Sequence, residues 1–245
     1  MDYSRIREYR DALSTAPHLS DLKNICKDFC DAAGLDYYHF GVCEAVSLTS
    51  PKLSSLTNFP AAWVEQYFQN RASSTDPILK YSFSNTAPIL WSELAHLDGY
   101  NNAGDQAFMR VGREHGLRHG LTVPLSPPSG QTAFFSLATQ EDDVDENRLG
   151  NLLPAAGIYS QYLFDAYIRI DKIENPKVNE LTKRELECVF WACEGKTAWE
   201  MAHIVGVSER TINFHLTSVI KKLGASNRQH AVAKAVMYGL VKPRP

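Results

Sequence analysis

The chain has 245 residues with an ordinary apolar content of 44% and a formal net charge of −3 at pH 7, and it is long enough for one large domain and one small one. No apolar run approaches the length of a membrane span, and the N-terminus is amphipathic rather than signal-like. The five cysteines lack zinc-ligand spacing with a histidine partner, so we expect reduced thiols in a cytoplasmic protein that has no membrane partner.

Hydrophobic periodicity and the positions of glycine and proline predict the elements of the N-terminal part. Helices are expected at 3–13, 20–33, 60–70, 104–115 and 145–173, with a further turn of helix starting at Asp76-Pro77. Strands are expected at 35–46, 119–125 and 131–140, with a break at Pro51 and a short extended piece that ends at Trp91. Strands flanked by helices on both sides favour an α/β/α sandwich, and the fold as a whole is α+β once the C-terminal helices are added.

Charge separates this part of the chain from the rest near Pro176, which lies in a polar segment that we interpret as a linker. From Pro176 onward 11 lysines and arginines stand against 6 acidic residues, whereas the remainder has 14 against 22. A basic small domain beside an acidic large one favours a nucleic-acid partner for the C-terminal part only.

Four short helices are predicted between Leu181 and Val241, and they have clear start and stop signals. Thr197 caps the second of them, and Glu200 three residues later closes a capping box. Gly206 ends that helix, and after a tight turn Ser208 caps the third. Two helices joined by a short turn that contains glycine form a helix-turn-helix.

The third of these helices has two different faces. One is apolar and is expected to pack in a core; it carries Ile212, Leu216, Val219, Ile220 and Leu223. The opposite face carries Arg210, Asn213, Phe214, Thr217 and Lys221. A solvated face normally mixes acids with bases, whereas this one has no acid, and its amide and hydroxyl groups suit base edges in a major groove. The alternative, an ordinary amphipathic surface helix, is disfavoured by the neighbouring elements.

Three runs of this segment resemble the C-terminal DNA-binding domain of LuxR-type transcription factors: G-K-T-x-x-E-M-A, S-E-R-T-I-x-F-H and K-K-L-G-A-S-N-R. The resemblance implies a homodimer that binds double-stranded DNA at a roughly palindromic site and acts with RNA polymerase. Asn213 and Thr217 are expected to specify bases, with Thr197 and Phe214 in the same interface. Phosphate contacts are expected from Lys196, Arg210, Lys221, Lys222 and Arg228.

A second resemblance covers the N-terminal part. LuxR-family receptors for N-acyl-homoserine lactones share a sparse set of residues, and this chain has them at matching spacing: Trp63, Tyr67, Asp76, Pro77, Trp91 and Gly120. Without the resemblance, aromatic residues at helical spacing and an Asp-Pro pair indicate only a core and a helix start. With it, the chain is identified as a LuxR-type quorum-sensing receptor. The lactone is then an allosteric effector, and neither a cofactor nor a metal is implied.

Each of these residue types suits one part of an acyl-homoserine lactone. The Trp63 indole only donates and suits the lactone carbonyl, whereas the Asp76 carboxylate accepts and suits the amide N–H. Tyr67 and Ser136 are expected to donate to the acyl carbonyl, and Trp91 to form a flat wall beside the lactone ring. For Ser136 a local hydrogen bond within its strand is the open alternative. Because a carboxylate in apolar surroundings needs donors, we infer that the ligand amide supplies one that the chain lacks.

Four further positions concern the shape of the pocket. Gly120 is expected to allow close backbone packing near it. Phe59 stands where many relatives carry tyrosine, which removes a hydroxyl from the head-group site. Ala133 and Phe134 lie where relatives often have smaller residues, and their bulk is expected to shorten or redirect the cavity for the acyl tail.

Other classes of protein find less support. No HExxH zinc motif accompanies His115 and His119, no G-x-S-x-G elbow is present, and no phospho-acceptor arrangement appears, so an enzyme is not expected. A ligand-independent regulator, or an interaction module whose pocket is empty or binds another small molecule, stays open as the alternative. The expected organisation is an autoinducer-binding and dimerisation domain at 1–173, a linker at 174–180 and a helix-turn-helix domain at 181–245. The expected function is ligand-gated control of quorum-sensing target genes.

Overall fold

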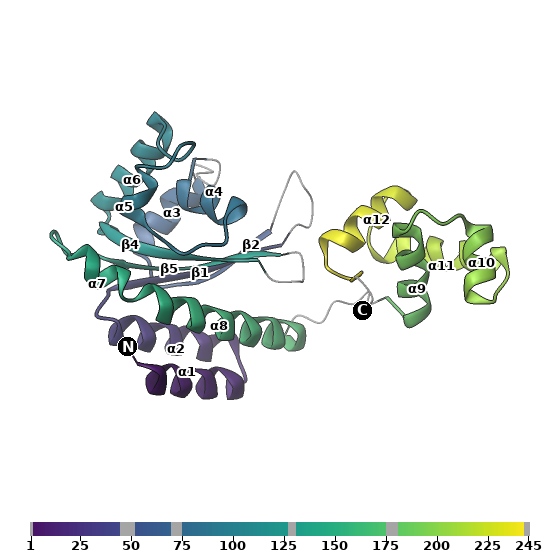
Figure 1. Ribbon diagram of the computed structural model, residues 1–245, viewed down its shortest axis with the longest axis horizontal. Coiled ribbons are helices and arrows are strands. Elements are labelled where there is room, and N and C mark those ends of the chain that lie inside the picture. The colour runs from purple at the N-terminus through teal and green to yellow at the C-terminus, as the bar shows by residue number, and fades with distance from the viewer. Residues whose placement is uncertain (1, 45–51, 70–74, 127–130, 175–180, 243–245) are drawn as a thin grey trace. The chain divides into compact units, whose positions relative to one another are not determined.

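A five-stranded sheet, flanked by helices on both faces, organises the N-terminal part of the chain (Figure 1). The computed structural model describes residues 2–44, 52–69, 75–126, 131–174 and 181–242. It divides into two units, of which the first contains the sheet and the second contains the C-terminal helices. The expected linker at 174–180 and the expected break at Pro51 lie outside the described residues, except for Glu174.

The strands of the sheet run in the order β2-β1-β5-β4-β3. Their bounds are β1 Tyr37–Glu44, β2 Lys52–Thr57, β3 Ile89–Leu90, β4 His119–Leu125 and β5 Thr132–Thr139. The central strand β5 pairs antiparallel with both β1 and β4. Because successive side chains of a strand point to opposite faces, Phe135 and Leu137 of β5 enter the main apolar core. Phe134 and Ser136 point to the other face.

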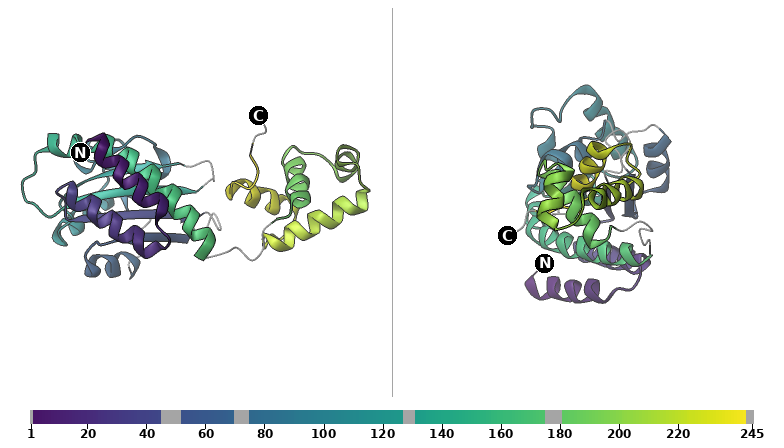
Figure 2. Two further views of the ribbon diagram at one scale, coloured as in Figure 1. Left: turned by 90° about the horizontal axis from the view of Figure 1, so that it is seen from below. Right: turned by 90° about the vertical axis from the view of Figure 1, so that its right-hand side faces the viewer.

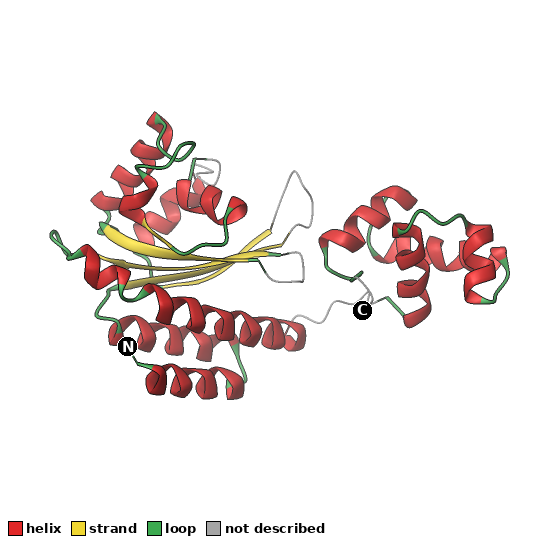
Figure 3. Cartoon of the chain, in the orientation of Figure 1, coloured by secondary structure: helices red, strands yellow, loops and turns green. Residues whose placement is uncertain are grey.

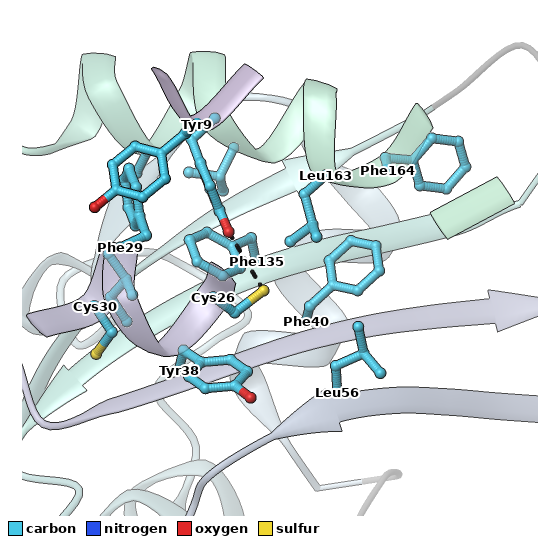
Figure 4. Close-up of a cluster of buried hydrophobic side chains, with 14 of the residues drawn as sticks. Tyr9, Cys26, Phe29, Cys30, Tyr38, Phe40, Leu56, Phe135, Leu163 and Phe164 are labelled. Atoms are coloured by element: carbon cyan, nitrogen blue, oxygen red, sulfur yellow. Dashed lines mark hydrogen bonds between the residues drawn. The ribbon is translucent and has the colours of Figure 1, made fainter. Parts of the chain in front are cut away.

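Three helices cover the face of Phe135: α1 (Tyr3–Thr15), α2 (Leu19–Ala32) and α8 (Leu153–Glu174). They lie together below the sheet in Figure 1, and in front of it in the view from below (Figure 2). Phe29 of α2 stacks on Tyr159 of α8 with ring centroids 3.8 Å apart, and Phe135 contacts both rings. The close-up shows Phe29 and Phe135 together in this core (Figure 4). Fully buried aromatic side chains of this size contribute most of a core's apolar burial, so this face stabilises the first unit.

The opposite face carries four helices (Figure 3): α3 (Ala61–Gln69), α4 (Pro77–Ser84), α5 (Trp91–Leu94) and α6 (Ala103–Glu114). Asp76 caps α4, and Pro77 occupies the first turn, where its missing N–H costs nothing. The Asp-Pro pair therefore starts a helix as predicted. The sandwich of helices, sheet and helices confirms the predicted fold class.

Three local predictions differ from the structure. Residues 52–57 form the edge strand β2, which sequence pattern did not indicate, and the extended piece at Trp91 turns at once into α5. The single helix expected at 145–173 is divided into α7 (Glu146–Gly150) and α8, and Pro154 lies in the first turn of α8. Proline is tolerated there and not in a helix interior, so the chain places the break before it.

The second unit consists of α9 (Lys183–Cys193), α10 (Ala198–Val205), α11 (Glu209–Lys222) and α12 (Arg228–Met237). The predicted capping box of α10 forms, since the Thr197 N–H donates to Glu200 and the Glu200 N–H donates to Thr197. Gly206 ends α10 in the left-handed region at φ 73°, and Ser208 caps α11. The helix-turn-helix is therefore built as the sequence predicts. None of the helices in the described chain is long and apolar enough to cross a bilayer.

Gly120 of β4 permits an unusually close contact between the sheet and α5. A Cβ atom added at this position would lie 2.5 Å from the carbonyl oxygen of Leu137 and 2.9 Å from two ring atoms of Trp91. Neither neighbour is the flexible end of a side chain, so the close packing expected from sequence depends on glycine.

Replacing Gly120 with alanine is therefore expected to destabilise the first unit by about 1–3 kcal/mol, the usual effect of overpacking. Gly157 in α8 is a matched control, because a Cβ there meets nothing within 4 Å; alanine in a helix is favoured over glycine by about 0.5–1 kcal/mol. Urea unfolding followed by circular dichroism measures both changes. Equal stability of the two variants would contradict the steric argument.

Candidate ligand cavity and nucleic-acid interface

A cavity of about 60 Å³ lies between the sheet and the helices α3–α6. One water molecule needs roughly 10–15 Å³, so the space exceeds that of a single water even without a ligand. Its wall is mostly apolar and aromatic, with a few polar groups. Six of the candidate ligand residues line it: Phe59, Trp63, Tyr67, Asp76, Trp91 and Ser136. The seventh, Gly120, is not among the lining residues but lies against the ring of Trp91, which is one of them.

Asp76 is buried in the cavity wall and already has three hydrogen-bond donors. Its Oδ1 atom accepts the backbone N–H groups of Ile78 and Leu79 at 2.9 and 3.1 Å. Its Oδ2 atom accepts the hydroxyl of Tyr67 at 3.0 Å. The inference that the chain lacks a donor for this carboxylate is thus wrong, because helix capping supplies two donors that a search for basic residues does not reveal.

Two consequences follow from these contacts. Each carboxylate oxygen accepts about two hydrogen bonds, so Oδ2 retains capacity for one more donor whereas Oδ1 is filled. Burial raises the pKa of Asp76 to about 6, and the three hydrogen bonds oppose this shift. The Tyr67 hydroxyl donates its proton to Asp76 in this structure, so the acyl carbonyl would have to find its donor at Ser136 rather than at Tyr67.

Trp63 and Ser136 offer donors on two sides of the cavity. Trp63 lines the cavity, and its indole N–H makes no hydrogen bond with the described residues. On the sheet, the Trp91 indole donates to the Thr122 hydroxyl at 2.9 Å, and this hydroxyl lies 2.8 Å from that of Ser136. Because indole only donates, the Thr122 hydroxyl accepts from Trp91 and can donate its own hydrogen bond to the Ser136 oxygen. The Ser136 hydroxyl is then able to donate a hydrogen bond to a ligand.

Phe134 and Ala133 of β5, both expected to shape the cavity for the acyl tail, lie on different faces of the sheet. Phe134 lines the cavity and lies over Gly41 of the neighbouring strand, where a Cβ atom would come within 2.5 Å of its ring. Ala133 points to the opposite face and is buried in the main core, so the expectation that it shapes the tail cavity is wrong. A one-residue step along a strand exchanges the two faces.

Sequence reasoning missed two polar residues of this region, Thr122 and His39. Thr122 lies two positions beyond Gly120 on β4 and therefore on the same face of the sheet. His39 interrupts an aromatic and apolar strand and lines the cavity. No group of metal-binding side chains that could hold an ion occurs among the described residues; His115 and His119 each lie near a backbone carbonyl.

In the second unit, the outer face of α11 is open to solvent. Phe214 is 69% exposed, and the other members of this face are exposed as well: Arg210, Asn213, Thr217 and Lys221. Ile212, Leu216 and Val219 are buried, as predicted. The Thr217 hydroxyl donates to the Asn213 carbonyl at 2.8 Å, so towards a base it can act only as an acceptor.

Two of the expected phosphate contacts have partners within the protein. The Lys222 ammonium lies 2.7 Å from Oε2 of the buried Glu185, and the Arg228 guanidinium donates to the carbonyl of Lys196. Glu185 also accepts from the Ser218 hydroxyl and the Thr182 N–H, at 2.6 Å each. Burial raises the pKa of Glu185, but these hydrogen bonds outweigh it and lower the pKa to about 2. Lys222 thus joins α9 to α11 and is not a free cation.

Comparison with known proteins gives matches over both units. The family model described as "Autoinducer binding domain" matches residues 18–167, and that described as "Bacterial regulatory proteins, luxR family" matches residues 179–235. The transcriptional activator protein AhyR of Aeromonas hydrophila is 34% identical over 99% of this chain and 94% of its own length. The crystal structure of Escherichia coli SdiA is similar with a TM-score of 0.84 and 26% identity, over 98% of this chain and 99% of SdiA. A structure of SdiA in complex with octanoyl-rac-glycerol has a TM-score of 0.82 at 26% identity, over 99% of this chain and 98% of that one.

Replacing Lys222 with methionine is expected to destabilise the second unit by about 1–3 kcal/mol, because it removes one partner from a buried carboxylate. Since the pKa of Glu185 is lower in the folded state than in the unfolded state, the ion pair with Lys222 stabilises the fold above about pH 4.5. This contribution is lost as the pH falls towards 2. Lys221→Met is the matched control, since Lys221 is exposed. Urea unfolding at neutral and at acidic pH tests this; an equal effect of both substitutions at neutral pH would refute the structural role of Lys222.

Proposed function

Since this chain belongs to the luxR family of bacterial regulatory proteins and carries an autoinducer binding domain, we propose that an N-acyl-homoserine lactone bound in the cavity gates its binding to DNA. The observation that carries the proposal is the cavity itself, in which an indole donor, a carboxylate and a hydroxyl face an otherwise apolar space. These three groups complement the lactone carbonyl, the amide N–H and the acyl carbonyl of such a ligand.

The polar groups divide the ligand between them. The unpaired Trp63 N–H donates to the lactone carbonyl, and Asp76 Oδ2 accepts the amide N–H as its second hydrogen bond. Ser136 donates to the acyl carbonyl, oriented by the chain from Trp91 through Thr122. A charge-assisted bond to Asp76 in a site without bulk water is stronger than a neutral one, so the amide is the principal anchor.

Gating follows from the state of the cavity without ligand. An acyl chain that fills apolar volume removes the cost of the empty cavity, and a ligand at a hundredfold excess over its Kd stabilises the folded state by about 2.7 kcal/mol. We assign the autoinducer-binding and dimerisation domain to 1–173, the linker to 174–180 and the DNA-binding domain to 181–245. Ordering of the first domain would allow a homodimer to present both second units to DNA.

The DNA contacts come from the outer face of α11 and the start of α10. Asn213 specifies a base through its amide, with Thr217 and Phe214 beside it. Phosphates are contacted by Arg210 and Lys221, and by Lys196 at the start of α10. Thr197 lies beside Lys196 in the same interface, but its N–H and hydroxyl both donate to Glu200. Arg228 supports this site by holding the carbonyl of Lys196. A homodimer places two such helices on a roughly palindromic DNA site. The protein acts in the cytoplasm, together with RNA polymerase.

A second ligand class is favoured by one observation on a similar protein. A structure of SdiA is in complex with octanoyl-rac-glycerol, which carries an acyl chain on a polyol and has no amide N–H. In this chain its hydroxyls could donate to Asp76 Oδ2 in place of an amide. An acylglycerol is therefore included with the lactones below, and a regulator that needs no ligand is the other alternative.

Lactones of short, medium and long acyl chains are expected to raise the midpoint of thermal unfolding of the full-length protein. The ligand-induced rise of this midpoint should become smaller as the pH is lowered, because a protonated Asp76 loses the charge that anchors the amide. With the pKa of Asp76 at about 6, the apparent Kd should be about tenfold weaker near pH 5 than near pH 7.

Asp76→Asn serves as the control, since an amide does not titrate and its affinity should be weak at both pH values. If an acylglycerol raises the midpoint and no lactone does, the ligand class is the acylglycerols and not the lactones. If no compound raises the midpoint while the protein is folded and binds DNA, gating fails and the ligand-independent regulator stands.

Asn213→Ala is expected to weaken binding to the preferred duplex by about 1–3 kcal/mol and to relax its sequence preference. Lys221→Ala should weaken binding to all duplexes alike and reduce the salt dependence. The preferred duplex is first selected from a random library, and fluorescence anisotropy at two salt concentrations then compares it with a scrambled one. Undiminished selectivity of Asn213→Ala would show that base recognition lies elsewhere.

A further inference from the structure

The face of β1 that borders the cavity carries a polar side chain to which the head-group contacts assign no role. Tyr38, Phe40 and Val42 point into the main core, and the residues between them point to the cavity side. His39 is one of these and lines the cavity together with Ser136. Its position on a paired strand fixes where its ring can reach.

The imidazole of His39 has a buried nitrogen without a partner. Its Nε2 atom is shut off from solvent and makes no hydrogen bond within the described part of the chain. The rings of Phe59 and Phe134 flank it at centroid distances of 5.2 and 5.0 Å. Buried polar atoms in proteins are nearly always paired, and an unpaired one costs free energy. Burial also lowers the pKa of His39 to about 4, so at pH 7 the ring is neutral and has one donor and one acceptor nitrogen.

His39 completes a row of polar side chains across three strands. It lies opposite Ser136 in the β1–β5 pair, and Ser136 lies opposite Thr122 in the β5–β4 pair. Neighbouring strands are about 4.7–4.9 Å apart. If Ser136 holds the acyl carbonyl, the third carbon of the acyl chain, two bonds further on, is within reach of the side chain on the next strand.

We propose that His39 recognises an oxygen substituent on the acyl chain of the ligand, at the third carbon. This inference rests on the proposed function and adds the chemistry of the tail to it. A hydroxyl there donates to the unprotonated ring nitrogen, whereas a keto oxygen accepts from the protonated one. An unsubstituted chain leaves Nε2 unpaired, as it is in the free protein.

The aromatic neighbours decide the strength of this contact. Because Nε2 is shut off from solvent, its hydrogen bond to a ligand oxygen forms away from bulk water. The Phe134 ring, which lies over Gly41, has to shift to admit the oxygen. The hydrogen bond then forms in dry, aromatic surroundings, where a missing partner is most costly.

The test compares three ligands that differ only at the third carbon: N-octanoyl-, N-(3-hydroxyoctanoyl)- and N-(3-oxooctanoyl)-homoserine lactone. Their affinities are measured at pH 7 with the full-length protein, with His39→Leu, which keeps bulk without nitrogen, and with His39→Gln, which keeps a donor and an acceptor. Met109→Leu is the matched control, since Met109 lines the same cavity with an apolar side chain.

The parent should bind one of the oxygenated ligands at least about tenfold more tightly than the unsubstituted one, and the preferred oxygen identifies the ring nitrogen that contacts it. His39→Leu should lose this preference and still bind the unsubstituted ligand, His39→Gln should retain part of it, and Met109→Leu should keep it. The inference is overturned if the parent binds all three alike, or if His39→Leu retains the preference. Absence of binding by every lactone would instead refute the proposed ligand class, and this inference with it.

Discussion

The Asp76 carboxylate joins the local folding of the first unit to the chemistry of its cavity. One of its oxygens caps α4 through two backbone N–H groups, and the other fixes the Tyr67 hydroxyl. The buried charge is therefore compensated before any ligand arrives, and it still has capacity for one further donor. Burial nonetheless raises its pKa to about 6, so mildly acidic pH protonates the one carboxylate among the described residues that line the cavity.

The sheet separates stability from binding by its two faces. On one side Phe135 packs with Phe29 and Tyr159 in a dense aromatic core. On the other, the polar row of Thr122, Ser136 and His39 borders the cavity. Since both sets share the same strands, the packed core holds the polar groups of the cavity side in place.

In the second unit the comparable element is Glu185. It belongs to the capping box of α9 and also accepts from Ser218 and Lys222 of α11. This contact fixes the orientation of α11 relative to α9 and so the direction in which Asn213 and Lys221 project. The two neighbouring lysines consequently differ: Lys221 is exposed on the outer face of α11, whereas Lys222 forms an ion pair with Glu185.

The sequence by itself determined the features that depend on near neighbours in the chain. Capping and periodicity are local, so they predicted the helix starts at Asp76, Thr197 and Ser208 and the two faces of α11. The family resemblance, which covers nearly the whole chain, indicated the close packing at Gly120. Only the tertiary structure decided which groups are already paired. In the structure the Tyr67 hydroxyl donates to Asp76, and Lys222 donates to Glu185. Ala133 lies in the main core rather than in the cavity, and Nε2 of His39 has no partner among the described residues. The physical reason is that a hydrogen bond or ion pair between distant segments depends on strand register and helix packing, which no stretch of sequence contains.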